Sequence, residues 1–210
     1  MNHQSNRQWP NSLVRFATYQ NTGQANPSWG YQQLCGRLVE ISGIGAVASI
    51  TAAVGLIADA QKQGELVAWI GMGAGIFFPP DVVSNGVDIE ALAVIRSPNA
   101  SGSARIANYL IRSRAFGLVV IDFTSDAKIS MALQGRLATL AQKSGTAVVG
   151  ITKTASMYPS IGSMVSLRIE ILRQRVEFDR FHCQVNVLKD KRCGPGWKHM
   201  EVMCGPVGLH

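Results

Sequence analysis

A strand, a glycine-containing turn and the start of a helix are predicted by the segment Arg37-Leu-Val-Glu-Ile-Ser-Gly-Ile-Gly-Ala-Val-Ala-Ser-Ile50. Residues 37–42 have the short, β-branched character of a strand. Over residues 47–63 apolar side chains recur at helical spacing, and Gly64 then supplies a helix stop. A second apolar strand is predicted at 66–70. The segment therefore predicts a strand–loop–helix–strand unit.

The same alternation continues toward the C-terminus. Strands are predicted at 91–95, 118–121 and 147–151, and helices at 103–113 and 127–143. Continuous apolar strands separated by helices are typical of a parallel sheet that is covered on both faces.

The pattern changes beyond residue 158, where apolar and polar residues alternate with period two. Strands of this kind are predicted at 165–172, 176–188 and 197–203. Such alternation is typical of antiparallel strands with one solvated face. We therefore predict an α/β fold with a mostly parallel central sheet, flanking helices and antiparallel C-terminal strands.

The composition indicates one globular domain with a basic surface. The chain has 210 residues, of which 47% are hydrophobic and 16% charged, and a formal net charge of +7. The excess of cations favours an anionic partner, such as nucleic acid, an acidic protein or a membrane surface. Because the excess lies largely in the C-terminal third, it points more toward a protein partner than toward bare DNA. Residues 1–30, rich in Asn, Gln and Ser, predict a flexible arm before a domain over 31–210.

The sequence predicts a cytoplasmic protein without a membrane segment. Its four cysteines are too few for a disulfide framework, and the polar first residues do not resemble a signal peptide. The apolar stretches 44–58 and 66–80 are shorter than the roughly 20 residues that a spanning helix needs.

The unit around Gly43 has the layout of a P-loop, in which backbone amides hold phosphate, a lysine neutralises it and a hydroxyl holds magnesium. The reactive residues are replaced. Ala48 stands at the position of the second glycine, Ser49 at that of the lysine, and Ile50 at that of the hydroxyl. Asp122, at the end of a predicted strand, matches the acidic residue of such a core or lies in a surface turn.

Several blocks of the chain follow the order and spacing of the RecA recombinase core. These blocks are residues 36–43, 57–64, 85–92, 119–122 and 187–191. Residues 30–209 thus resemble a RecA core, and most closely the short RecA-like proteins of the bacterial DNA-damage mutasome, the ImuA family. The turn at 77–86, with its paired prolines, also resembles that family.

The resemblance implies a protein without ATPase activity and without a cofactor. In RecA a catalytic glutamate follows the second core strand, whereas Gly-Met-Gly occupies 71–73 here. Without that glutamate, the lysine and the hydroxyl, ATP hydrolysis has neither a general base nor a magnesium site. RecA's DNA-binding loop corresponds to 152–164, which carries one cation, Lys153, and one aromatic residue, Tyr158, so we expect weak or no direct DNA binding.

Lys189 and Lys191 match a Lys-x-Lys pair that reaches a neighbour's ATP in RecA filaments. One interpretation is a solvated strand end in a basic stretch. The other is that this pair docks against a nucleotide-bearing RecA subunit.

The resemblance implies an adaptor in SOS mutagenesis that links RecA to an inactive Y-family polymerase homologue of the ImuB type. An error-prone replicative-type polymerase would join the complex indirectly. A RecA-like cell-division inhibitor that binds the tubulin-like division protein is the alternative. A residual nucleotide-dependent enzyme or regulator is a third hypothesis.

A metal site is a further hypothesis, although we predict none. Histidines and cysteines gather near the C-terminus, at His182, Cys183, Cys193, His199 and Cys204. Their spacing lacks a C-x-x-C knuckle, and cysteine on a strand is often a small buried residue. A metal assay on protein purified without a chelator tests this prediction.

Overall fold

The computed structural model describes residues 29–204, apart from 45–47, 73–76, 78, 124–128, 176–179 and 195. The expected alternation of strands and helices is present. The elements are α1 (Tyr31–Leu34), β1 (Leu38–Ser42), α2 (Ser49–Lys62), β2 (Leu66–Met72), α3 (Pro79–Ser84), β3 (Leu92–Ser97), α4 (Ala100–Ser113), β4 (Phe116–Asp122), α5 (Met131–Ser144), β5 (Ala147–Thr152), β6 (Leu167–Arg175), β7 (Arg180–Asp190) and β8 (Lys198–Cys204).

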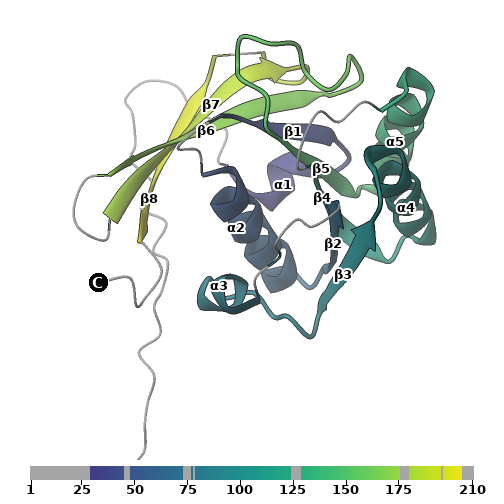
Figure 1. The fold of residues 1–210 in the computed structure, drawn as a ribbon, viewed down its shortest axis with the longest axis horizontal. Coiled ribbons are helices and arrows are strands. Elements are labelled where there is room, and N and C mark those ends of the chain that lie inside the picture. The colour runs from purple at the N-terminus through teal and green to yellow at the C-terminus, as the bar shows by residue number, and fades with distance from the viewer. Residues whose placement is uncertain are drawn as a thin grey trace, which may run out of the picture.

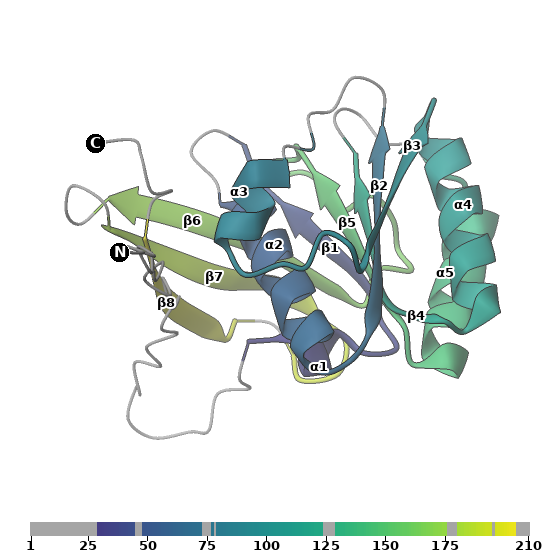
Figure 2. The ribbon, with the colours of Figure 1, turned by 90° about the horizontal axis from the view of Figure 1, so that it is seen from below.

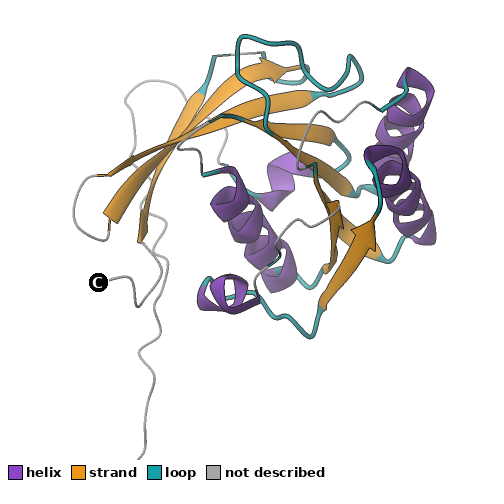
Figure 3. Cartoon of the chain, viewed as in Figure 1, coloured by secondary structure: helices purple, strands orange, loops and turns teal. Residues whose placement is uncertain are grey.

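All the described strands join one sheet, in the order β3-β2-β4-β5-β1-β6-β7-β8 (Figures 1 and 3). Neighbouring strands are parallel from β3 through β2, β4, β5 and β1 to β6. Strand β7 is antiparallel to both of its neighbours, β6 and β8. The predicted fold class is therefore confirmed. Strands β6 to β8 extend the sheet beyond its covering helices, which agrees with their alternating sequence (Figure 1).

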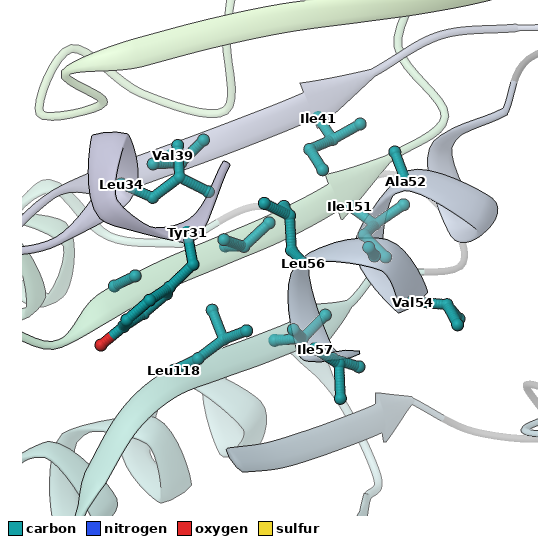
Figure 4. Packing of buried hydrophobic residues seen from close by; sticks show 14 of the residues in the cluster. Tyr31, Leu34, Val39, Ile41, Ala52, Val54, Leu56, Ile57, Leu118 and Ile151 are labelled. Carbon is teal, nitrogen blue, oxygen red and sulfur yellow. The ribbon is translucent and has the colours of Figure 1, made fainter. Parts of the chain in front are cut away.

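Helices cover both faces of the parallel part of the sheet (Figure 2). Helices α1 to α3 lie on one face, where α1 and α2 bury Leu34, Leu56 and Ile57 against β1, β4 and β5 (Figure 4). Helices α4 and α5 pack on the opposite face around Ile111 and Leu137. Two buried cores, one on each face, thus hold the sheet between them.

Helix boundaries differ from the predicted ones where capping residues set them. The predicted helix at 103–113 begins earlier, at Ala100, because the Asn99 side chain accepts a hydrogen bond from the Gly102 amide at 2.8 Å. The helix predicted from residue 127 begins at Met131, after the N-cap Ser130. Periodicity alone therefore misplaces a helix start by a few residues in either direction.

Two short helices were not predicted. Helix α1 buries Tyr31 and Leu34, and α3 begins at the paired prolines, where proline is tolerated because the first helical amides lack intrahelical acceptors. Residues 1–28 of the predicted arm lie outside the described residues, and Trp29 packs against the first core. No helix within the described ranges is both long and apolar enough to cross a membrane.

Candidate functional site

Three chain segments meet where the parallel strands end. Ser42 of β1 pairs with Thr152 of β5, and Asp122 of β4 pairs with Ile151 of β5. The carboxyl ends of β1, β4 and β5 therefore lie at the same edge of the sheet. The loops after β1 and β5 begin at this edge, and Asp122 lies there as well. In open parallel sheets this edge is where ligands and partners usually bind.

The positions of the P-loop lie at the start of α2. The Ala48 amide donates to the Ile171 carbonyl at 3.1 Å, and α2 begins at Ser49. Ser49 is buried, and its Oγ has no hydrogen-bond partner within the described residues, whereas the Ile50 side chain is 50% exposed. Residues 48–50 supply no ammonium group, and residue 50 has no hydroxyl. These residues therefore do not fit a magnesium–triphosphate ligand.

Asp122 is half-buried at the sheet edge, beside Gly71 of β2. Burial raises the pKa of its carboxyl above the ordinary value, and the positive charge of Lys153 partly opposes this increase. Gly71 and Met72 bring no carboxylate to the position of the missing glutamate. Asp122 and Lys153 thus bring opposite charges to this edge of the sheet.

The segment 153–166 between β5 and β6 (Figure 1), here called the tethered loop, is held by hydrogen bonds to Glu40. Glu40 lies in the middle of β1 and is 0% exposed. Its carboxylate accepts hydrogen bonds from the Thr152 hydroxyl at 2.9 Å, from the Ile161 amide at 3.2 Å and from the Ser160 hydroxyl. A buried carboxylate of β1 therefore organises the loop that leaves β5.

Arg168 of β6 holds the other half of the tethered loop. Its Nε lies 3.6 Å from Glu40 Oε2 and donates to Ser42 Oγ at 3.1 Å. The two terminal nitrogens of the guanidinium donate to the Tyr158 and Ala155 carbonyls, at 2.6 and 3.1 Å. The ion pair thus joins β1, β6 and the loop in one buried network.

Further side chains hold the end of the tethered loop. Gln134 of α5 donates to the Ile161 carbonyl at 3.1 Å, and packs so closely on Gly162 that a Cβ there would overlap it. The ammonium groups of Lys189 and Lys191 both donate to the Ser163 carbonyl, at 3.3 and 2.8 Å. Burial and the charge of Lys191 lower the pKa of Lys189. The predicted interface lysines therefore also hold the loop.

The tethered loop exposes an apolar tip. Met157 is 83% exposed and Tyr158 59%, and Met164 is 37% exposed farther along the loop. Lys153 is the one cation in the loop sequence, which contains no carboxylate. One aromatic residue and two methionines give little of the stacking surface that single-stranded nucleic acid needs.

The roles of Glu40, Arg168 and Gln134 in holding the loop were not predicted from the sequence. The sequence did contain one indication of these roles: Glu40 and Arg168 are charged residues within otherwise apolar, buried stretches of strand. Buried charges in such positions require a partner, although the sequence does not identify which residue it is. The position of Gln134 on a helix face gave no comparable signal.

The histidines and cysteines near the C-terminus do not form a cluster within the described residues. His182 and Cys183 are neighbours on β7, so their side chains project to opposite faces of the sheet. Cys183 is buried in the first core, and Cys193 lies in the turn after β7. The structure describes no side chain at Cys204.

The known proteins to which the chain is similar are RecA proteins. A model of the RecA N-terminal domain family matches residues 27–158, which is more than half of the chain and includes the P-loop positions and Asp122. Protein RecA of Nocardioides sp. is 34% identical over 135 residues, covering 59% of this chain and 38% of that protein.

Two further relatives agree. Protein RecA of Picosynechococcus sp. is 39% identical over 87 residues, covering 41% of this chain and 25% of that protein. Protein RecA of Bacteroides thetaiotaomicron is 32% identical over 136 residues, covering 59% of this chain and 40% of that protein. The chain therefore spans two fifths or less of the length of these curated relatives.

Proposed function

Because the chain belongs to the RecA N-terminal domain family, we propose that it is a non-catalytic, RecA-like adaptor in DNA-damage-induced (SOS) mutagenesis. In this role it resembles the ImuA family and links RecA to an inactive, ImuB-like homologue of a Y-family polymerase. An error-prone replicative-type polymerase joins the translesion synthesis complex indirectly.

One observation carries the proposal: the RecA-type sheet and helices are present, but the P-loop side chains that would hold nucleotide are not. Residues 48–50 are Ala, Ser and Ile, with the Ser49 hydroxyl buried. A RecA-like domain without these groups can still present surfaces that bind other proteins, but it has no means of hydrolysing ATP. Its function then lies in binding other proteins.

We expect no ATP binding tighter than about 1 mM, because no lysine ammonium is available at residue 49 to neutralise the phosphates. Isothermal titration calorimetry with ATP and magnesium should give no heat of binding, and ATP should not raise the melting temperature. RecA measured under the same conditions is the positive control. A thermal shift with ATP at micromolar concentration would contradict the prediction and favour a nucleotide-dependent regulator.

The tethered loop supports weak or absent DNA binding of the RecA type. Its backbone is fixed by Glu40, Arg168 and Gln134, and its tip offers a single aromatic ring, Tyr158. The Ser160 hydroxyl and the Ile161 amide of the loop already bond to Glu40.

The variant Lys189→Glu/Lys191→Glu is expected to weaken binding to a RecA filament by about tenfold or more, because it reverses two neighbouring positive charges at the proposed contact. Surface plasmon resonance against filaments assembled with a non-hydrolysable ATP analogue measures the change. Unchanged affinity would exclude this pair from the interface.

Two controls accompany this variant. Since both lysines bond the Ser163 carbonyl, the milder Lys189→Gln/Lys191→Gln variant shows whether lost charge alone weakens binding. Lys62→Glu, an exposed change at the end of α2, tests a charge reversal far from the pair in sequence.

Pull-downs with three purified proteins test the proposed function itself. Retention of the ImuB-like polymerase homologue is expected, together with RecA, and no retention of the tubulin-like division protein. The opposite result would replace the adaptor function with that of a RecA-like cell-division inhibitor.

A further inference from the structure

Helices α4 and α5 together form a face that carries only positive charge. Neither helix contains an aspartate or a glutamate. Arg105 and Arg112 of α4 are exposed, as are Arg136 and Lys143 of α5. These four cations and Tyr109 are called the α4–α5 face below.

The four cations occupy matching positions. Helix α4 connects β3 to β4 and α5 connects β4 to β5, and these strands are all parallel, so both helices run in the same direction. They lie side by side on one face of the sheet (Figures 1 and 2). In each helix the two cations stand five and twelve residues after the first residue, Ala100 or Met131. Seven residues are nearly two helical turns, about 10.5 Å, so each pair lies on one side of its helix. The result is two parallel rows of positive charge.

No carboxylate neutralises these rows within the described residues. The two ion pairs found there, Arg37–Asp190 and Arg168–Glu40, are both buried elsewhere. None of the four cations donates a hydrogen bond within the same residues. Asp59 of α2 lies on the opposite side of the sheet, and Asp88 lies beside α2 through hydrogen bonds to Gln61. The sheet therefore separates these two carboxylates from the rows.

Tyr109 lies within the α4 row and is 71% exposed. It follows Arg105 by four residues and precedes Arg112 by three, so its ring lies beside both on the helix surface. The ring is not packed in either of the two buried cores. Tyrosine and arginine are the residue types most enriched among those that dominate the binding energy of protein interfaces.

We propose that the α4–α5 face docks an acidic protein surface that has an apolar pocket for Tyr109. The inference rests on the adaptor function proposed above, and it assigns that function a surface separate from Lys189 and Lys191. Positive rows without counter-charges match an acidic partner. A nucleic acid fits less well, because the two helices offer a single aromatic ring for base stacking.

The experiment compares two double variants of the full chain that make the same change in charge. Arg105→Glu/Arg136→Glu alters the α4–α5 face, and Lys62→Glu/Lys198→Glu alters exposed residues of α2 and β8. Tyr109→Ala tests the aromatic anchor. Binding is measured by surface plasmon resonance to the purified ImuB-like polymerase homologue, to RecA filaments and to a thymidine oligonucleotide. Circular dichroism and melting temperature verify the fold of each variant.

We expect Arg105→Glu/Arg136→Glu to weaken binding to one of the two proteins by about tenfold or more, and Tyr109→Ala to weaken the same complex by a similar factor. The control double variant should change it by less than about twofold. Equal affinity of parent and variant for both proteins would overturn the inference and leave the adaptor function standing. An equal loss in the control, or a loss confined to the oligonucleotide, would also overturn it. If the parent binds neither protein, the adaptor function is wrong and the inference falls with it.

Discussion

The variant Glu40→Gln is expected to lower the free energy of unfolding by about 3–5 kcal/mol, since it leaves the buried guanidinium of Arg168 without its counter-charge. The new amide group also faces the Thr152 hydroxyl and the Ile161 amide, which both donate to the carboxylate. A buried donor that loses its acceptor is strongly destabilising. Urea unfolding followed by circular dichroism measures the loss.

Two comparisons make this prediction specific. Glu90→Gln makes the same chemical change at an exposed position and should alter stability by less than about 0.5 kcal/mol. The double variant Glu40→Gln/Arg168→Met should be more stable than Glu40→Gln alone, because it removes the uncompensated charge. A loss below about 1 kcal/mol for Glu40→Gln would mean that the tethered loop does not depend on this pair.

The variant Asp190→Asn is expected to be destabilised by a similar amount, about 3–5 kcal/mol at neutral pH. Asp190 Oδ1 lies 2.6 Å from the Arg37 guanidinium, and both side chains are almost fully buried. The carboxylate also accepts hydrogen bonds from the Arg192 and Cys193 amides and from Trp197 Nε1, at 2.8, 3.3 and 3.2 Å. The network joins the start of β1 to the end of β7, so it fixes the antiparallel strands to the parallel sheet.

The loss in Asp190→Asn should depend on pH. Burial by itself would raise the pKa of Asp190, but the hydrogen bonds from Arg37 and its other donors hold this pKa below its ordinary value of 3.8. A carboxyl with a lowered pKa stabilises the folded state above the pKa of the unfolded chain, and this contribution disappears as pH falls through the folded pKa. Urea midpoints of parent and variant should therefore converge in acid. A constant difference from pH 7 to acid would show that the charge is not responsible.

Most of the elements could be predicted from the sequence, because burial on both faces of a parallel sheet demands continuous apolar strands. Strand β5, predicted at 147–151, extends over Ala147–Thr152, and the change of period beyond residue 158 marks the antiparallel strands. Helix starts were less accurate, since a side chain such as Asn99 decides them by hydrogen bonding and not by hydrophobicity. Helix α1 is too short to show a period.

The candidate site was predicted only in part. Replacement of the P-loop residues at 48–50 is visible in the sequence because the motif is local and contiguous. The partners of Glu40 lie more than 100 residues away along the chain, at Thr152, Ser160 and Ile161. Nothing in a single sequence pairs residues at that separation.

The α/β fold, the altered nucleotide loop and the excess of positive charge can all be read from the amino-acid sequence, since each depends on residue type and local spacing. The distribution of that charge over the molecule follows instead from the folding of the chain. Arg37 and Arg168 form buried ion pairs. Arg105 and Arg136 instead lie exposed on two helices that contact each other only in the folded state. The physical reason is that desolvation and pairing depend on which segments the fold brings together, so equal charges in the sequence become unequal in the molecule.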